Sequence, residues 1–118
     1  MSKKLRILAV EDDYLLLKVL GQMLEEAGFE VALARNGRIA LDLVESFQPQ
    51  VILLDMMMPL MDGAAFIAEL SSGPGAAVPI VALSASLKSG DQVSGAAVSL
   101  AKPVSRDDIL AAVRGLLG

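Results

Sequence analysis

Hydrophobic and polar positions along the chain alternate in blocks that predict five short strands. Leu5–Val10 is a largely apolar run that ends at three acids. Phe29, Val31 and Leu33 occupy alternate positions, as the buried residues of a half-buried strand do. The remaining predicted strands are Val51–Leu54, Pro79–Leu83 and, with a weaker pattern, Ala97–Ala101.

Between these runs, apolar residues recur every three and four positions, which is the spacing of one face of an α-helix. The first predicted helix ends at Gly28, and its inward stripe is Leu16, Val19, Leu20, Met23, Leu24 and Ala27. The second opens at Asn36-Gly37 and turns Ala40, Leu43, Val44 and Phe47 inward. The third begins near Asp62-Gly63 and buries Phe66, Ile67 and Leu70; the last is capped by Ser105 and buries Ile109, Val113 and Leu116.

The segment between Ser84 and Lys102 has the weakest helical pattern. Its 17 residues, ASLKSGDQVSGAAVSLA, include two glycines and four serines. Each glycine costs a helix roughly 1 kcal/mol relative to alanine. We therefore expect a helix here that is short, mobile or partly unfolded.

Alternating strands and helices predict an α/β fold with a five-stranded parallel sheet, doubly wound and covered by helices on both faces, as in a three-layer sandwich. The length of 118 residues fits one domain, and we expect residues 1–118 to form a single domain without an effector unit. Sheets of this kind bind ligands at the carboxyl ends of their strands.

Composition excludes several classes of function. Without Cys or His, the chain cannot form disulfides, thiolate or imidazole metal sites, or a Ser–His relay. A net charge of −4 argues against nucleic-acid binding by this domain. No uncharged run is long and apolar enough to suggest a membrane span, and the start MSKKLR does not resemble a signal peptide. We therefore expect a soluble, cytoplasmic protein.

Polar residues follow four of the predicted strands at the edge where ligands bind. They are Glu11, Asp12 and Asp13 after the first strand, Asp55 after the third, Ser84 after the fourth and Lys102 after the fifth. Each has a plainer explanation alone, since Asp is a common turn or capping residue and Ser and Lys are common in solvated loops. Their convergence on one edge indicates a site.

Carboxylates crowded at such an edge require compensation. At an effective dielectric constant near 20, two carboxylates 4 Å apart repel by about 4 kcal/mol. Either one acid is protonated or a divalent cation lies among them, and an all-oxygen site suits a hard ion such as Mg²⁺ or Mn²⁺. A lysine and a hydroxyl can hold the other oxygens of a phosphoryl group, which Asp55 can accept as a nucleophile.

With these motifs, the chain resembles the receiver domain of two-component response regulators, which has a flavodoxin-like fold of the chemotaxis-regulator type. The resemblance covers essentially the whole chain and rests on ILAVEDD, VILLDMMMPLMDG, VPIVALSA and AKP in this order. It implies a phosphoacceptor module that takes a phosphoryl group from a histidine kinase or a histidine phosphotransfer domain. Such a module then changes its interaction with a downstream protein target and is not an enzyme acting on other substrates.

The resemblance implies a role for each matching residue. Asp55 would be phosphorylated, with Lys102 and the Ser84 hydroxyl contacting the phosphoryl oxygens. Mg²⁺ would be bound by Glu11, Asp12, Asp55 and the backbone carbonyl of Met57, with Asp13 less essential. The Lys102–Pro103 peptide bond would be cis, and Gly63 would allow a tight entry to the third helix.

The chain departs from the family pattern in two places. Ser99 stands at the position of an aromatic residue that turns inward when the hydroxyl moves toward the phosphoryl group. The segment between Ser84 and Lys102 is about one helical turn short. With a serine and a weak helix here, the structural response is expected to be an ordering of residues 86–98 and not an aromatic flip.

Two alternatives to a phosphoreceiver remain at this point. A phosphatase or phosphotransferase of the haloacid-dehalogenase type would need an acid two residues after the nucleophile, where this chain has Met57. A pseudo-receiver would only dock partners, although none of the expected site residues is missing. The candidate docking surface is the outer face of the first helix, with Tyr14, Leu15 and Leu17, extended by Met57, Met58 and Met61. Scattered surface hydrophobes and loop packing explain these residues equally well.

Overall fold

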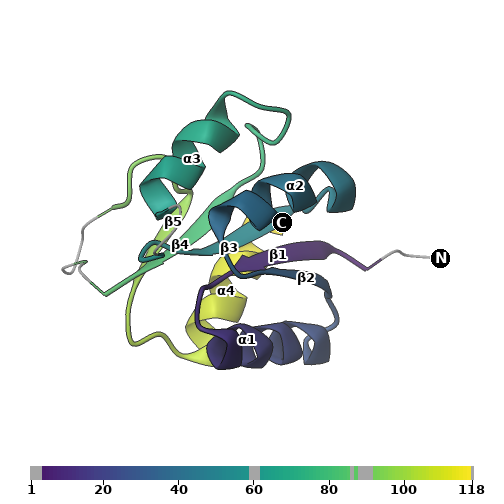
Figure 1. Ribbon diagram of the computed structural model, residues 1–118. Helices are drawn as coiled ribbons and strands as arrows, with labels where there is room; N and C mark the ends of the chain where they lie inside the picture. Colours follow the sequence, from purple (N-terminus) through teal and green to yellow (C-terminus); the bar gives the residue numbers. More distant parts are fainter. Residues whose placement is uncertain (1–3, 59–61, 86, 88–91, 118) are drawn as a thin grey trace.

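The computed structural model describes residues 4–58, 62–85, 87 and 92–117, which form one parallel sheet flanked by helices (Figure 1). The strand order is β2-β1-β3-β4-β5, so the chain reverses direction across the sheet after β2. This is the predicted doubly wound arrangement. The strands are β1 (Arg6–Val10), β2 (Glu30–Ala34), β3 (Val51–Asp55), β4 (Ile80–Ser84) and β5 (Val98–Ala101).

Strand register brings the carboxyl ends of the strands to one edge. Val10 lies opposite Leu54, and the residues that follow each of them are acids. Asp55 lies opposite Leu83. Ser84 lies opposite Ala101, one residue before Lys102. The alignment of parallel strands therefore places polar residues from the ends of four strands along one edge of the sheet, which we call the carboxyl rim.

Side-chain caps fix where the helices begin, because the first N–H groups of a helix have no partner within it. Asp13 accepts from the N–H groups of Leu15 and Leu16, and Asn36, Asp62 and Ser105 each accept from the N–H three residues later. The helices are α1 (Tyr14–Glu26), α2 (Gly37–Phe47), α3 (Gly63–Ser71) and α4 (Arg106–Leu117).

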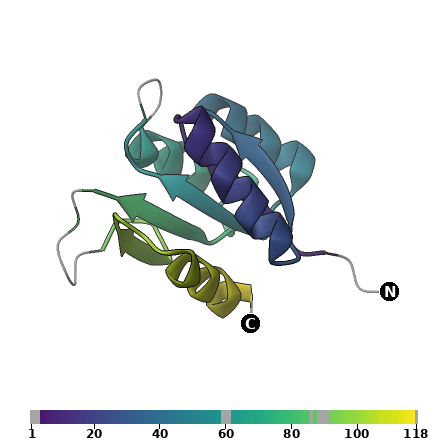
Figure 2. The same ribbon diagram turned by 90° about the horizontal axis from the view of Figure 1, so that it is seen from below.

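Each face of the sheet packs against one pair of helices, which gives three layers (Figures 1 and 2). Above the sheet in Figure 1, Ala40 and Val44 of α2 and Phe66 and Leu70 of α3 form what we call the α2/α3 core. Below it, side chains of α1 and α4 form the α1/α4 core, with Leu20, Leu24, Ile109, Leu110 and Val113. β1 and β3 are almost wholly buried between these layers, so their ends are rigid supports.

The connection between β4 and β5 follows the expectation of a weak helix. Of its described residues, 85, 87 and 92–97, none is helical. The remaining positions of the expected helix, 86 and 88–91, lie outside the described residues. Within residues 92–97, Ser94 and Gly95 disfavour a helix, since both residue types favour other backbone conformations.

The predicted inward face of α1 is partly wrong. Leu16 and Val19 were expected inside but are 38% and 61% exposed, whereas Leu17, expected outside, is buried. The buried stripe is Leu17, Leu20, Gly21 and Leu24, which has the same helical spacing. The Leu-rich sequence allowed either face. Gly21 fits the observed one, because a Cβ there would lie 2.9 Å from Leu33 Cδ2 of β2, a close contact that a small shift of this flexible side-chain tip would relieve.

None of the helices in the described part of the chain combines the length and apolar character needed to cross a membrane.

Replacing Gly63 by Ala should destabilise the fold. A Cβ at this first position of α3 would lie 2.7 Å from the Cα of Met56, and backbone cannot move aside as a side-chain tip can. We expect a loss of about 2 kcal/mol in the free energy of unfolding, measured by urea denaturation.

Gly115→Ala is the matched control, because a Cβ there meets no atom within 4 Å. This substitution in α4 should be neutral or stabilise by up to about 1 kcal/mol. Equal effects of the two substitutions would contradict the steric explanation.

Candidate functional site

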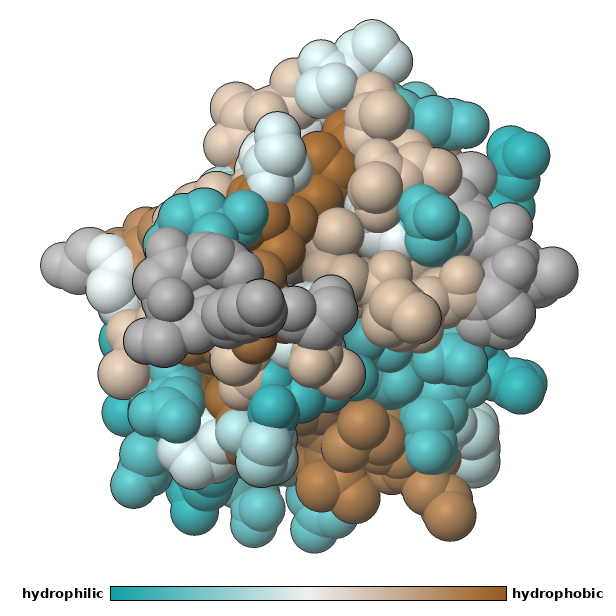
Figure 3. Space-filling view, turned by 90° about the vertical axis from the view of Figure 1, so that its left-hand side faces the viewer, coloured by the Kyte–Doolittle hydropathy of each residue, from teal (hydrophilic) through white to brown (hydrophobic). Residues whose placement is uncertain are grey.

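Three carboxylates gather at the carboxyl rim, where β1 and β3 end. Glu11 and Asp12 follow β1, Asp55 ends β3, and one oxygen from each lies within 4.8 Å of the others. Glu11 and Asp55 are buried, whereas Asp12 is exposed. Figure 3 is viewed from this rim and shows a hydrophilic area to the right of and below the centre, with a hydrophobic area directly beneath it. The predicted cluster therefore forms, with one acid open to solvent.

Asp55 is held by donors from two directions. Its Oδ1 accepts from Lys102 Nζ at 2.9 Å and from the N–H of Met57 at 3.2 Å. The side chain is only 3% exposed. A buried carboxylate with both a cation and a backbone donor on one oxygen has a fixed orientation, and its other oxygen takes no part in these two contacts.

Glu11 is the member of the cluster whose buried carboxylate is not fully hydrogen-bonded. Its Oε1 accepts from the N–H of Asp13 at 3.2 Å, whereas its buried Oε2 has no hydrogen-bond partner and lies 4.0 Å from Lys102 Nζ. Burial is the main cause that raises the pKa of Glu11 from 4.5 to about 7. The hydrogen bond from Asp13 lowers the pKa, the nearby Asp55 raises it, and Lys102 lowers it.

Lys102 and Ser84 complete the site from the far side of β3. The backbone N–H of Lys102 donates to the carbonyl of Ser84 at 2.9 Å, so the ends of β4 and β5 are tied together. Ser84 is buried, and Lys102 reaches both Asp55 and Glu11. The Lys102–Pro103 peptide bond is cis, as the resemblance implied.

Other predicted residues have different positions from those expected. Asp13 caps α1, as expected of a common capping residue, and it does not belong to the cluster of three carboxylates. Met57 is 65% exposed beside the site, but Met58 is buried, so its assignment to a docking surface is wrong. The assignment of Leu17 to that surface is also wrong, because Leu17 is buried. Met61 lies outside the described residues.

One feature of the rim was missed from sequence. The ring of Tyr14 at the start of α1 has Lys18 Nζ and Arg35 Cζ each 5.5 Å from its centroid, a distance suited to cation–π attraction. Arg35 directly follows β2. The polar residues predicted for the site directly follow four of the predicted strands, and the second strand is not among them. The same search after the second strand would have found Arg35.

The donor atoms at this rim suit a hard cation. Three carboxylates are present, and one buried oxygen, Glu11 Oε2, has no hydrogen-bond donor. A buried acceptor without a partner is costly and signals a missing proton or ion. Oxygen ligands alone fit Mg²⁺ or Mn²⁺ better than zinc or copper. The residues present therefore fit the predicted metal.

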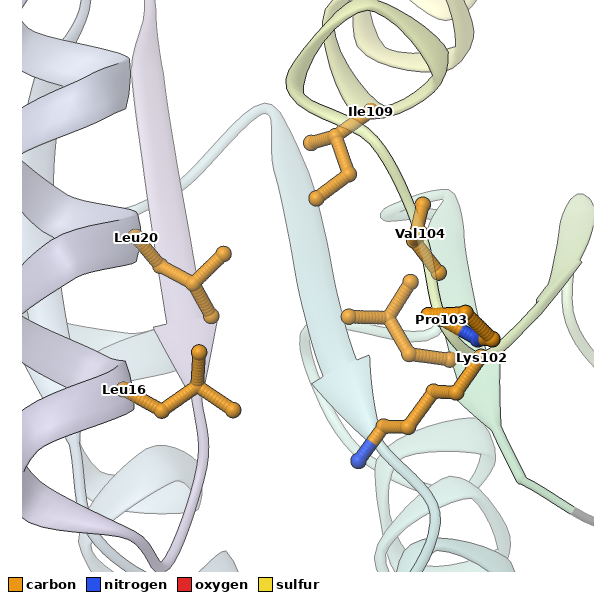
Figure 4. Close-up of a pocket in the computed structure, with 7 residues that line it drawn as sticks. Leu16, Leu20, Lys102, Pro103, Val104 and Ile109 are labelled. Atoms are coloured by element: carbon orange, nitrogen blue, oxygen red, sulfur yellow. The ribbon is translucent and has the colours of Figure 1, made fainter.

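A groove of about 500 Å³ opens beside Lys102 (Figure 4). In the close-up, Leu16 and Leu20 of α1 face Val104 and Ile109 across it, and the ammonium group of Lys102 lies at one end. Leu83 and Pro103 also line it. The groove thus joins an apolar surface to the charged rim.

With this geometry established, comparisons with known proteins define the family. Residues 7–114 match the response regulator receiver domain, and the chain belongs to this family. Members of the family are signalling modules and not classical enzymes. Among curated relatives, response regulator MprA of Mycolicibacterium vanbaalenii is 38% identical over 116 residues, which are 95% of this chain and 50% of that protein. The chain therefore spans about half the length of the curated relatives it matches.

Solved structures agree on the CheY-like, flavodoxin-like fold. The receiver domain of sensor histidine kinase PA1611 from Pseudomonas aeruginosa is 30% identical, has a TM-score of 0.89, and is covered over 99% of its length by 98% of this chain. That structure has a magnesium ion coordinated in its active site cleft. Chemotaxis protein CheY4 of Vibrio cholerae is 26% identical, has a TM-score of 0.83 and is covered over 99% of its length by 97% of this chain.

The raised pKa of Glu11 predicts how stability depends on pH in the metal-free protein. The folded chain holds this proton up to about pH 7, whereas the ordinary value is 4.5. Folded protein therefore binds more protons between these values, and the stabilisation present below 4.5 is lost as the pH rises through 7.

Urea denaturation in a chelating buffer at about pH 5 and about pH 8 tests this prediction by comparing wild type with Glu11→Gln. Wild type should lose up to about 3 kcal/mol more than the variant over this interval, at about 1.4 kcal/mol per pKa unit. Identical pH dependence in the two proteins would contradict a proton on Glu11.

Proposed function

We propose that this chain is a phosphoacceptor module of a two-component phosphorelay and that Asp55 accepts the phosphoryl group. The observation that carries this proposal is the buried Asp55 carboxylate, held by Lys102 and the Met57 N–H beside two further acids. Held in this way, the side chain is aimed before any donor arrives. Such positioning lowers the entropic cost of bringing donor and acceptor together.

In the proposed reaction, a carboxylate oxygen of Asp55 attacks the phosphorus atom of a phosphohistidine or a small acyl phosphate. The new P–O bond gives an acyl phosphate on Asp55, the bond between phosphorus and the donor breaks, and its electron pair leaves with the donor. Lys102 is already within hydrogen-bond distance of Asp55 and would stabilise the added negative charge. Ser84, which ends β4 at the same rim, would contact another phosphoryl oxygen.

Glu11, Asp12, Asp55 and the backbone carbonyl of Met57 would hold Mg²⁺. The ion would neutralise charge on the transferring phosphoryl group. Support comes from the oxygen donors and the unpartnered Glu11 Oε2, together with the magnesium ion in the related receiver domain.

The residues around Asp55 favour a signalling module over a turnover enzyme. Two positions after Asp55, where a dehalogenase-type phosphatase needs an acid, Met57 has a thioether that cannot donate a proton. The product would therefore remain on the protein until water removes it. A phosphorylated state that persists can be recognised by a downstream protein target.

The donor would be a histidine kinase or a histidine phosphotransfer domain that docks beside the rim. Exposed side chains of Tyr14, Leu15 and Val19 on α1, with Met57 next to Asp55, form a hydrophobic surface there, which we call the α1 surface. On the same helix, Leu16 lines the groove at Lys102, whereas Leu15 and Val19 line a separate hollow beside β2. An apolar surface next to a charged site suits a helical partner that presents its histidine to Asp55.

Incubation with a small acyl phosphate and Mg²⁺ should add one phosphoryl group per chain, measured by intact mass. Asp55→Asn should abolish the gain, because an amide is a far poorer nucleophile than a carboxylate. Asp42→Asn removes an exposed acid on α2 and should leave the gain unchanged. A gain that persists in Asp55→Asn would contradict the assignment of Asp55.

Leu15→Arg should slow phosphorylation by a phosphohistidine protein at least tenfold, because a charge would be buried when the α1 surface is covered. Phosphorylation by a small acyl phosphate should be unchanged, since that donor needs no docking surface. Ile39→Arg, at an exposed aliphatic residue of α2, is the matched control and should behave as wild type with both donors. Equal slowing with both donors would indicate damage to the site and not to docking.

A further inference from the structure

The two departures of this sequence from the family pattern meet in one contact. Ser99 Oγ accepts a hydrogen bond of 2.8 Å from the backbone N–H of Val93, in the shortened connection between β4 and β5. Both residues are partly buried. The serine hydroxyl thus bonds directly to the backbone of the shortened connection.

Residues 92–97, which we call the 92–97 turn, pack onto the sheet beside α3. The N–H of Ala96 donates to the carbonyl of Val93, and that of Ala97 donates to the carbonyl of Ile80. Side chains of Val93 and Ala96 contact the α2/α3 core. At Gly95, with a φ of 88°, a Cβ would lie 2.6 Å from Cγ2 of Ile67 in α3, so the turn is in close contact with that helix.

The turn covers the same face of the sheet to which Ser84 belongs. Ala82 of β4 lies in the α2/α3 core and pairs with Ser99. Ser84 lies two residues after Ala82 and therefore on the same face, opposite Ala101. One face of two neighbouring strands thus carries both the hydroxyl at the site and the hydroxyl that holds the turn.

β5 is less restrained than the inner strands, although Val98 and Leu100 pack against the α1/α4 core. It is an edge strand of four residues, paired with β4 on one side only, and none of its residues is fully buried. The hydrogen bond from Val93 to Ser99 adds a tie between the connection and this strand, three residues before Lys102. Only Ser99, Leu100 and Ala101 separate Lys102 from the hydrogen bond that holds the 92–97 turn. A displacement of Lys102 would therefore be transmitted to the turn along this short segment.

We propose that the Val93–Ser99 hydrogen bond is a latch that holds the 92–97 turn on the sheet in the unmodified protein and is released when Asp55 is phosphorylated. This inference rests on the proposed function and gives the site a structural output that needs no aromatic side chain at position 99. It departs from the ordering of residues 86–98 expected from the sequence, because residues 92–97 are already hydrogen-bonded to β4 and β5 in the unmodified protein. The released turn uncovers the α3 side of β4 and β5.

Release follows from the space and charge at the site. Asp55 is almost fully buried, so a phosphoryl group requires the rim to open, and it adds roughly −1.5 to −2 charge. Lys102 is drawn to that charge, and its backbone N–H is bonded to the carbonyl of Ser84, so the ends of β4 and β5 move together. A hydrogen bond weakens steeply with distance and angle, and the bond to Ser99 is the contact that such a shift disturbs.

Amide hydrogen exchange at Val93, followed by NMR, tests the resting latch. In unmodified wild type this amide should be protected, and Ser99→Ala should speed its exchange on the order of tenfold. Ser99→Thr keeps a hydroxyl and should restore protection. Ser94→Ala removes an exposed hydroxyl one residue from Val93 and is the matched control. An unprotected Val93 amide, or one unaffected by Ser99→Ala, would overturn the latch.

The same measurement under steady phosphorylation by a small acyl phosphate tests release, with the phosphorylated fraction read by intact mass. Exchange at Val93 should rise on the order of tenfold in wild type and stay unchanged in Asp55→Asn. Unchanged exchange at high phosphorylated fraction would overturn the latch and leave the proposed function intact. Absence of any mass gain would overturn the proposed function and release together, while the Ser99→Ala comparison still decides whether the hydrogen bond holds the turn.

Discussion

Repulsion among three carboxylates at the end of two buried strands is the constraint on which the rest of this structure depends. One carboxylate oxygen from each of Glu11, Asp12 and Asp55 lies within 4.8 Å of the others, and Lys102 forms ion pairs with Glu11 and Asp55. On a flexible loop these acids would move apart. β1 and β3 prevent this, because they are buried on both faces by the helix layers. The sheet therefore holds the acids in an arrangement that is unfavourable unless a proton, a cation or a phosphoryl group with its counterions compensates the charge.

The sequence predicted the positions of residues that lie at the ends of parallel strands. It did not predict the positions of residues whose burial depends on packing between distant segments. Parallel strands must align their carboxyl ends, so the grouping of Asp55 with Glu11, Asp12, Ser84 and Lys102 followed from the strand assignments alone. The inward face of α1 did not follow, because YLLLKVLGQML has apolar residues on more than one face. The observed face brings Gly21 close to Leu33, which is twelve positions away, and local sequence does not show this contact. Met58 was placed on the surface for a similar reason, since local sequence does not show that the α2/α3 core receives it.

Ser99 illustrates the same limit at the site's far side. Sequence alone shows that an aromatic residue is absent and that the connection is short, and each looks like a loss. In the folded chain the serine hydroxyl accepts from the backbone N–H of Val93, so residues 92–97 of the shorter connection are bonded to the sheet. This pairing depends on the path of residues 92–97 across β4 and β5, and no periodicity in the sequence encodes that path.

The short edge strands also bear on how this domain behaves at high concentration. The chain is 54% hydrophobic, and an open sheet has two edges with unpaired backbone groups that can join another sheet. Both edges here are short, with five residues in β2 and four in β5. Glu30 begins β2 and forms an ion pair with Arg6 at 3.5 Å, so a charge stands where a foreign strand would begin to pair. The four-residue length of β5 and the charges beside β2 thus limit the backbone that each edge offers to another sheet.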